Sequence, residues 1–363
     1  MNVRERNNFD LIRLFAASQV VLLHSLTHFS LIPASGFWAR IIDGVRWFPG
    51  VPIFFVVSGF LITPSLERSA TLAQYARKRV LRIYPALWCY VGVCLALLAA
   101  LGVIRLSTLG HRWFWMWVGC QVTVFQAWNP EQLRHFGAGA VNGSLWTIPV
   151  EVGFYVGIAL LYAVFGLRKG GKWAATAVFV AAGAVSLATW RIFQVGTFAP
   201  THGFFGKALS MTPLPHFWIW LLGALAYKHF DRVRPFVAGW FVPWFAAYLV
   251  LGRWLSLHQE LMYPMLGIVT LSAAYSMPGT SRALLRGNDI SYGVYLYHML
   301  AINALIALDL PRIGWTVIAV FGCAFAVACA SWLLVERPAL RLKSSARQAG
   351  RSTHATAIGA KLI

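Results

Sequence analysis

Apolar segments of about 20 residues recur along the whole chain, and this recurrence limits the fold more than any other feature. The segments lie at 10–29, 48–66, 84–104, 145–167, 173–193, 213–228, 236–252, 261–277, 291–308 and 314–334. A helix of about 20 apolar residues crosses the hydrocarbon core of a bilayer. Hydrophobic residues make up 59% of the chain and charged residues 12%, which leaves too few polar side chains for a water-soluble domain. The sequence predicts an all-α polytopic membrane protein with about ten transmembrane helices.

The formal net charge of +20 invites a nucleic-acid-binding interpretation, which the distribution of the charges argues against. With the N-terminus in the cytoplasm, 21 of the 31 Lys and Arg residues fall on the cytoplasmic side, nine fall outside, and Arg13 lies within the first span. Such a bias is the positive-inside pattern of membrane proteins. We therefore expect both termini in the cytoplasm, contacts with membrane lipids and no nucleic-acid partner.

The stretch 105–144 is the irregular part of the chain. An apolar run within it, near 112–128, is short for a span, and a crossing there would invert every later loop and abolish the charge bias. We expect a re-entrant or interfacial helix near 112–128. Residues 1–342 are predicted to form one membrane domain, and 343–363, rich in Ser, Arg and Ala, a disordered cytoplasmic tail.

The first span carries a stripe of polar and small residues along one face. Arg13 and His24 are eleven residues apart, close to three helical turns, and Asp10, Ala17 and His28 continue the same face. Ionisable side chains inside a membrane are costly and usually face a partner, a cavity or a substrate path. We expect the chemistry of the protein along this stripe.

Glu151 in the fourth span is predicted to lie at the depth of His24. Counting at 1.5 Å per residue from opposite ends of the two spans places both side chains in the outer third of the membrane. A carboxylate beside an imidazole orients the ring and raises its basicity, which suits removal of a proton from a hydroxyl. A purely structural His24–Glu151 bond that joins two helices is the alternative.

Other polar side chains are candidates for supporting roles. Arg79 and Arg82 are three residues apart just before the third span, so they share a helix face and could bind phosphate groups, or else anchor the chain to lipid headgroups. Ser58 interrupts the second span, and His298 lies within the ninth. Five cysteines form no metal-binding or disulfide pattern, and no metal site is expected.

Several motifs, in this order, resemble the membrane-bound acyltransferase-3 family. They are 8–13 (NFDLIR) with His24, 50–62 (GVPIFFVVSGFLI), 79–85 (RVLRIYP), 144–155 (SLWTIPVEVGFY), 291–298 (SYGVYLYH) and 336–338 (ERP). The resemblance extends over nearly the whole chain. Thr147 stands where Ser is expected, and 195–275 carries no recognisable motif.

This resemblance implies a bacterial inner-membrane enzyme that transfers an acyl group, usually acetyl, from cytoplasmic acyl-CoA to a sugar hydroxyl of a cell-surface or exported glycan. In such enzymes the positions that match Arg13, His24, Arg79 and Arg82 are functional. The predicted site therefore has His24 and Glu151 as catalytic residues and Arg13, Arg79 and Arg82 as acyl-CoA ligands. Asp10, Ser58, Trp146, Tyr155 and His298 are predicted to support these residues around an intramembrane path.

Three questions stay open at the level of the sequence. A transporter or flippase of glycan lipids also needs charge within the membrane, although the inverted repeats and paired broken helices typical of transporters are not evident. The acyl group could equally be succinyl or a longer chain. Whether it passes directly to the acceptor or first rests on His24 is not encoded in any motif.

Overall fold

The computed structural model describes residues 7–193 and 204–342, and within these ranges every regular element is a helix. The longer helices are α1 (Phe9–His28), α3 (Gly50–Glu67), α4 (Leu72–Ala100), α6 (Thr147–Val164), α7 (Lys172–Ile192), α9 (Phe217–Lys228), α11 (Phe241–Leu255), α12 (Gln259–Tyr275), α14 (Ser291–Ala307) and α15 (Gly314–Ser331). Each overlaps one of the ten predicted spans. The predicted all-helical, polytopic membrane architecture is therefore confirmed.

Shorter helices lie between these longer ones along the chain. They are α2 (Phe37–Arg46), α5 (Arg112–Val122), α8 (Phe204–Ser210), α10 (Phe230–Val237) and α13 (Thr280–Leu285), and a π-helix, Trp332–Glu336, extends α15. In the described residues six helical stretches are long and apolar enough to cross a membrane, or seven if α10 and α11, bent by 80°, count as one span. Helices α9, α12 and α14 have 12, 17 and 17 residues and fall below this length. The number of ten crossings stays a prediction.

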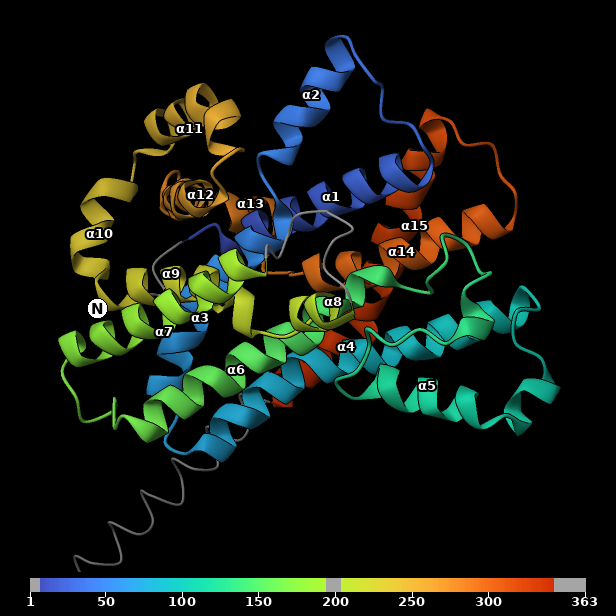
Figure 1. Cartoon of the computed structure of the whole chain (residues 1–363), viewed down its shortest axis with the longest axis horizontal. Coiled ribbons are helices and arrows are strands. Elements are labelled where there is room, and N and C mark those ends of the chain that lie inside the picture. Colours follow the sequence, from blue (N-terminus) through green and yellow to red (C-terminus); the bar gives the residue numbers. More distant parts are fainter. Residues whose placement is uncertain (1–6, 194–203, 343–363) are drawn as a thin grey trace, which may run out of the picture.

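Helix α3 lies at the centre of the bundle and packs closely against α9 and α1 (Figure 1). Two glycines make the α3–α9 contact possible. A Cβ atom on Gly59 would lie 1.9 Å from the carbonyl oxygen of Trp220, and one on Gly223 would lie 2.0 Å from that of Val56. Glycine at such positions lets two helix backbones approach within the membrane. Close helix packing is therefore one function of the residues around Ser58.

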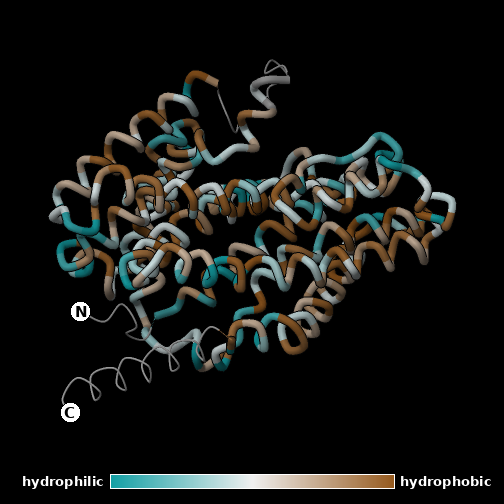
Figure 2. The backbone as a smooth tube through the Cα atoms, turned by 90° about the horizontal axis from the view of Figure 1, so that it is seen from below, coloured by the Kyte–Doolittle hydropathy of each residue, from teal (hydrophilic) through white to brown (hydrophobic). Residues whose placement is uncertain are grey.

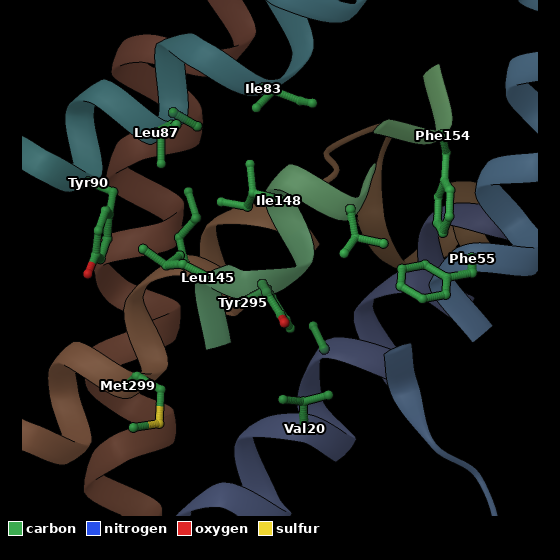
Figure 3. Packing of buried hydrophobic residues seen from close by; sticks show 14 of the residues in the cluster. Val20, Phe55, Ile83, Leu87, Tyr90, Leu145, Ile148, Phe154, Tyr295 and Met299 are labelled. Carbon is green, nitrogen blue, oxygen red and sulfur yellow. The ribbon is translucent and has the colours of Figure 1, made fainter. Parts of the chain in front are cut away.

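The buried core runs between α3, α4, α6 and α14. Ile83 and Leu87 of α4 face Ile148 of α6, while Phe55 of α3 packs edge-on against Phe154 with ring centroids 4.9 Å apart (Figure 3). Large apolar side chains such as those of Trp88, Val156, Val180 and Ile318 are instead exposed on the outside of the bundle. Hydrophobic residues follow the helices along most of their length (Figure 2), as expected for rods that face lipid.

The irregular stretch 105–144 contains a short helix, as predicted. Helix α5 has 11 residues, too few to cross a bilayer, and lies beside α4 at the end of the molecule opposite α10 to α12 (Figure 1). It ends at Val122 rather than near 128, and just beyond this end the Gln126 side chain donates to the backbone carbonyl of Thr123 at 2.6 Å. Asn303 of α14 holds the following loop by donating to the carbonyls of Ala140 and Val141, both at 2.8 Å.

Helix α4 begins twelve residues before the predicted start of the third span. The Thr71 side chain accepts a hydrogen bond from the amide of Gln74 and caps the helix at its N-terminus. Arg79 and Arg82, predicted to share a helix face just before the third span, both lie within α4. Because the first turns of this helix are polar, a hydropathy count does not detect them. The predicted tail, 343–363, lies outside the described residues.

Candidate active site

A cavity of about 360 Å³ lies between α1, α3, α4, α6 and the start of α14. The charged side chains that line it are those of Arg13, Arg79, Arg82, Glu151 and Asp289. Four of these five were predicted as site residues. Apolar side chains, among them those of Phe54, Ile62 and Ile148, form the rest of the wall. The cavity thus combines three guanidinium groups with an apolar lining.

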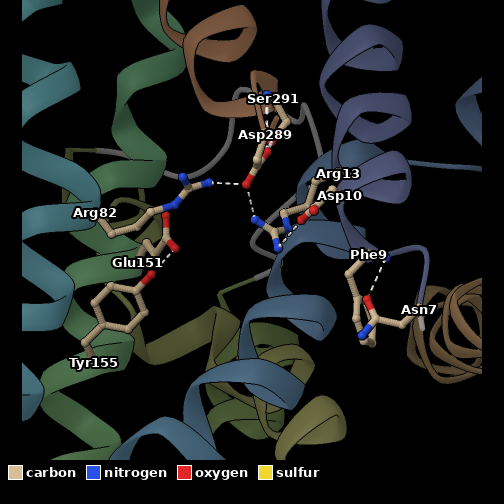
Figure 4. A network of polar contacts seen from close by, with 9 residues as sticks. All are labelled: Asn7, Phe9, Asp10, Arg13, Arg82, Glu151, Tyr155, Asp289 and Ser291. Carbon is tan, nitrogen blue, oxygen red and sulfur yellow. Dashed lines mark hydrogen bonds and ion pairs between the residues drawn. The ribbon is translucent and has the colours of Figure 1, made fainter. Parts of the chain in front are cut away.

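Asp289 holds two of these arginines together. Its Oδ2 atom accepts hydrogen bonds from both the Arg13 and the Arg82 guanidinium groups, as Figure 4 shows. Asp10 accepts a further bond from Arg13 at 3.0 Å. Ser291, in the first turn of α14, donates its hydroxyl to the other carboxylate oxygen of Asp289. The beginnings of α1 and α14 and the middle of α4 are thereby joined through one side chain.

Asp289 was not among the predicted site residues. It lies in the turn just before α14, and a search for acids within the spans does not include it. Its position two residues before Ser291, at the start of a helix, is the signal that was available. Burial alone would raise the pKa of Asp289, but Arg13 and Arg82 lower it from 3.8 to about 2. The carboxylate is therefore ionised at neutral pH.

Arg79 has no carboxylate partner of this kind within residues 7–193 and 204–342. Its guanidinium donates to the hydroxyl of Ser65 at 3.2 Å and lies 5.5 Å from the ring centroid of Tyr155 and 5.9 Å from that of Tyr75. The Nε atom of Arg79 is buried and has no hydrogen-bond partner among the described residues. Of the three arginines that line the cavity, Arg79 is the one without an ion pair among the described residues, so its charge is available to an anionic ligand.

Glu151 pairs with a different residue from the one predicted. The hydroxyl of Tyr155, one turn further along α6, donates to its carboxylate, and both side chains line the cavity close to Arg82 (Figure 4). No hydrogen bond joins Glu151 to His24 in the part of the chain that the structure describes, so the predicted direct contact is wrong. Equal depth does not make two helices neighbours: α1 packs against α14 and α3, whereas α6 packs against α3.

His24 instead pairs with His298. Its Nδ1 atom lies 3.0 Å from the Nε2 atom of His298 on α14, and the Nδ1 atom of His298 lies 2.7 Å from the carbonyl oxygen of Tyr295. His298 is fully buried and His24 partly buried. The side chain of Tyr295 lines the cavity, and its ring centroid is 5.6 Å from that of His298. The histidine pair therefore lies next to the cavity at its Tyr295 end.

Ser58 and Trp146, which were also predicted to support the site, both contact aromatic side chains. Ser58 lines the cavity and accepts a hydrogen bond from the indole of Trp220 at 3.1 Å. Trp146 lies outside the cavity wall, with its ring centroid 5.3 Å from that of His216. Within residues 7–193 and 204–342 no three His, Cys, Asp or Glu side chains are grouped as metal ligands.

This chain is similar to known proteins over most of its length. Residues 6–335 match the acyltransferase domain family. The chain is 34% identical over 360 residues to Nodulation protein 10 of Rhizobium leguminosarum bv. viciae, an alignment that covers 94% of this chain and 95% of that protein. It is 25% identical over 307 residues to an O-acetyl transferase of Shigella phage Sf6, covering 81% and 84% of the two chains. No solved structure matches.

Both the family match and the rhizobial relative extend over nearly the whole chain, including every element that forms the cavity. This extent favours acyl transfer over the alternative of a glycan-lipid transporter. The chain belongs to the membrane-bound acyltransferase-3 family and is an integral-membrane O-acyltransferase.

Proposed function

We propose that this protein transfers an acetyl group from cytoplasmic acetyl-CoA to a hydroxyl group of a cell-surface or exported glycan, in the inner membrane of a bacterium. The observation that carries the proposal is the arrangement along α1. Arg13 faces the arginine-lined cavity, and His24, three turns further along the helix, lies beside the Tyr295 end of the same cavity. The name of the phage relative supports acetyl as the group and oxygen as the acceptor atom.

The cavity is suited to an anionic donor with a long uncharged arm. CoA carries phosphate groups that cannot enter lipid, and guanidinium groups bind phosphate in a bidentate manner. Arg79 is the foremost phosphate ligand, since Arg82 and Arg13 share their charge with Asp289. Arg13 and His24 are about 16 Å apart along α1, a distance that an extended pantetheine arm covers. The thioester then reaches the level of His24.

In the proposed reaction His24 acts as the general base. The acceptor oxygen attacks the thioester carbonyl carbon while its proton moves to a ring nitrogen of His24. A C–O bond forms, the C–S bond breaks, and the CoA sulfur leaves as a thiolate that takes the proton from the imidazolium. His24 therefore ends in its initial state, and no acyl-enzyme intermediate is needed.

Mass spectrometry of surface glycans from cells with and without the gene tests this function. The proposal predicts acetylated sugar residues that disappear on deletion and return with the wild-type gene but not with the His24→Ala variant. Glycans that are identical in the two strains would contradict it. A lost group with the mass of succinyl would show that the acyl group is wrong while the architecture holds.

The proposed orientation has a separate test. In a protein whose five native cysteines are replaced, single cysteines at Gly170 and Asp231 are expected to be shielded from a membrane-impermeant thiol reagent in intact cells. A cysteine at Arg134 is expected to react. These three positions are exposed in the structure, so burial does not confuse the result. Labelling at Gly170 or Asp231 would overturn the orientation.

A further inference from the structure

The contact between His24 and His298 determines the tautomer of the His24 ring as well as its position. An imidazole has two nitrogens, and in the neutral ring one donates a hydrogen bond while the other accepts. Only a nitrogen without a proton can remove one from an acceptor hydroxyl. The identity of that nitrogen in His24 therefore decides whether the ring can act as a base from its open side.

The carbonyl oxygen of Tyr295 determines the tautomer of His298. A carbonyl oxygen can only accept, so the Nδ1 atom of His298, 2.7 Å away, carries a hydrogen and donates it. No carboxylate among the described residues hydrogen-bonds to either ring, and a second proton on the fully buried His298 would be an uncompensated buried charge. The Nε2 atom of His298 therefore carries a lone pair.

This lone pair in turn determines which ring nitrogen of His24 carries the hydrogen. The Nε2 atom of His298 accepts, so the Nδ1 atom of His24, 3.0 Å away, is the donor. The Nε2 atom of His24 is left with its lone pair, and no described residue hydrogen-bonds to it. We propose that His298 is a positioning residue that holds His24 in the tautomer whose Nε2 atom is the catalytic base. This inference rests on the proposed role of His24.

Two substitutions of His298 differ by one methylene and separate this role from packing. The side-chain oxygen of Gln reaches the place of the Nε2 atom and can accept from His24. The shorter Asn amide stays near the place of the Nδ1 atom, where it can bond to the Tyr295 carbonyl but does not reach His24. A residue needed only to bond the carbonyl would be replaced better by Asn than by Gln.

Kinetics of acetyl transfer by the full chain in lipid nanodiscs provide the first measurement. His298→Asn is expected to lower kcat roughly 10- to 100-fold, the range for loss of an orienting partner, with KM for acetyl-CoA unchanged. His298→Gln is expected to retain kcat within a few-fold. Equal kcat values for Asn and Gln, or a change confined to KM, would overturn the positioning role.

Solid-state NMR of the protein labelled with ¹⁵N-histidine gives a measurement that does not depend on activity. The signals of His24 are assigned by their loss in His24→Ala. The wild type and His298→Gln are expected to show a bare Nε2 and a protonated Nδ1 at His24, and His298→Asn a mixture of both tautomers. A protonated Nε2 in the wild type, or an unchanged tautomer in His298→Asn, would overturn the inference.

The two measurements separate this inference from the proposed function. If the tautomer shifts as expected but His24→Ala still transfers acetyl, His24 is not the base and the proposed mechanism fails, although His298 does set the ring. If His24→Ala abolishes transfer while His298→Asn has normal kcat, His24 stays the base and only the positioning role fails.

Discussion

Arg82 on α4 donates a hydrogen bond to Asp289, which lies 207 residues further along the chain, and the carboxylate oxygen that accepts it also accepts one from Arg13. One buried carboxylate is therefore shared by two arginines from different helices, and Asp10 is a second partner of Arg13. The contact closes one end of the cavity and ties the beginning of α14 to the first and fourth helices. It makes Arg82 a structural residue as well as a candidate donor ligand.

Replacement of Asp289 by Asn is expected to destabilise the protein strongly. It would leave the partly buried Arg13 and Arg82 without the counter-charge they share, although Arg13 keeps Asp10; breaking a fully buried ion pair costs about 3–5 kcal/mol, which is an upper bound for these partly exposed groups. Thermal unfolding in detergent measures the loss. Asp309→Asn is the matched control, because Asp309 is exposed and its positive φ of 51° suits Asn. Equal unfolding temperatures for the two variants would contradict the structural role of Asp289.

Glu151 is expected to act with Tyr155 and independently of His24. The first two side chains are hydrogen-bonded, while His24 bonds to His298. Effects of residues without shared partners add as free energies, and those of a contacting pair do not. The rate losses of Glu151→Gln and His24→Asn should therefore multiply in the double variant, while those of Glu151→Gln and Tyr155→Phe should not. Initial rates at saturating acetyl-CoA provide the data, and the reverse pattern would restore the His24–Glu151 pair.

Much of the fold and four of the five charged residues that line the cavity could be predicted from the sequence. The ten apolar segments locate ten helices because hydropathy reports which residues can face lipid. Arg13 was recognised because charge inside a span is rare, and Arg79 because its spacing from Arg82 puts both on one helix face. The partners could not be predicted in this way: depth along a helix says nothing about which helix stands beside it. His24 therefore proved to contact His298 rather than Glu151.

The missed residue, Asp289, shows a second limit. It lies outside the spans by the hydropathy count, yet the fold brings it between two helices from the first quarter of the chain. Long-range pairing of this kind depends on the packing of α1 and α4 around α14. A single sequence carries no measure of that packing.

The closest helix contact offers a test of the bundle itself. Gly59→Ala would place a methyl group 1.9 Å from the carbonyl oxygen of Trp220, so α3 and α9 must separate. Overpacking of this kind typically costs about 1–3 kcal/mol, and we expect a lower unfolding temperature. Gly92→Ala on α4 is the control, since nothing lies within 4 Å of its Cβ position. Equal stabilities would show that α3 and α9 are not packed as described.

The central claim is that donor binding and proton removal occupy different places along one cavity. Arg79→Ala removes the cavity guanidinium that has no ion pair among the described residues, and loss of a charge-assisted contact costs about 1.5–3 kcal/mol, so acetyl-CoA affinity should fall about 10- to 150-fold in a folded protein. His24→Ala should leave affinity within a few-fold, while transfer falls by about 10²–10⁴.

Isothermal titration of acetyl-CoA into both purified variants, with acetyl transfer assayed on the same samples, tests this separation most directly. The account predicts weak binding by Arg79→Ala, and normal binding without turnover by His24→Ala. Normal binding by Arg79→Ala, or normal turnover by His24→Ala, would contradict it.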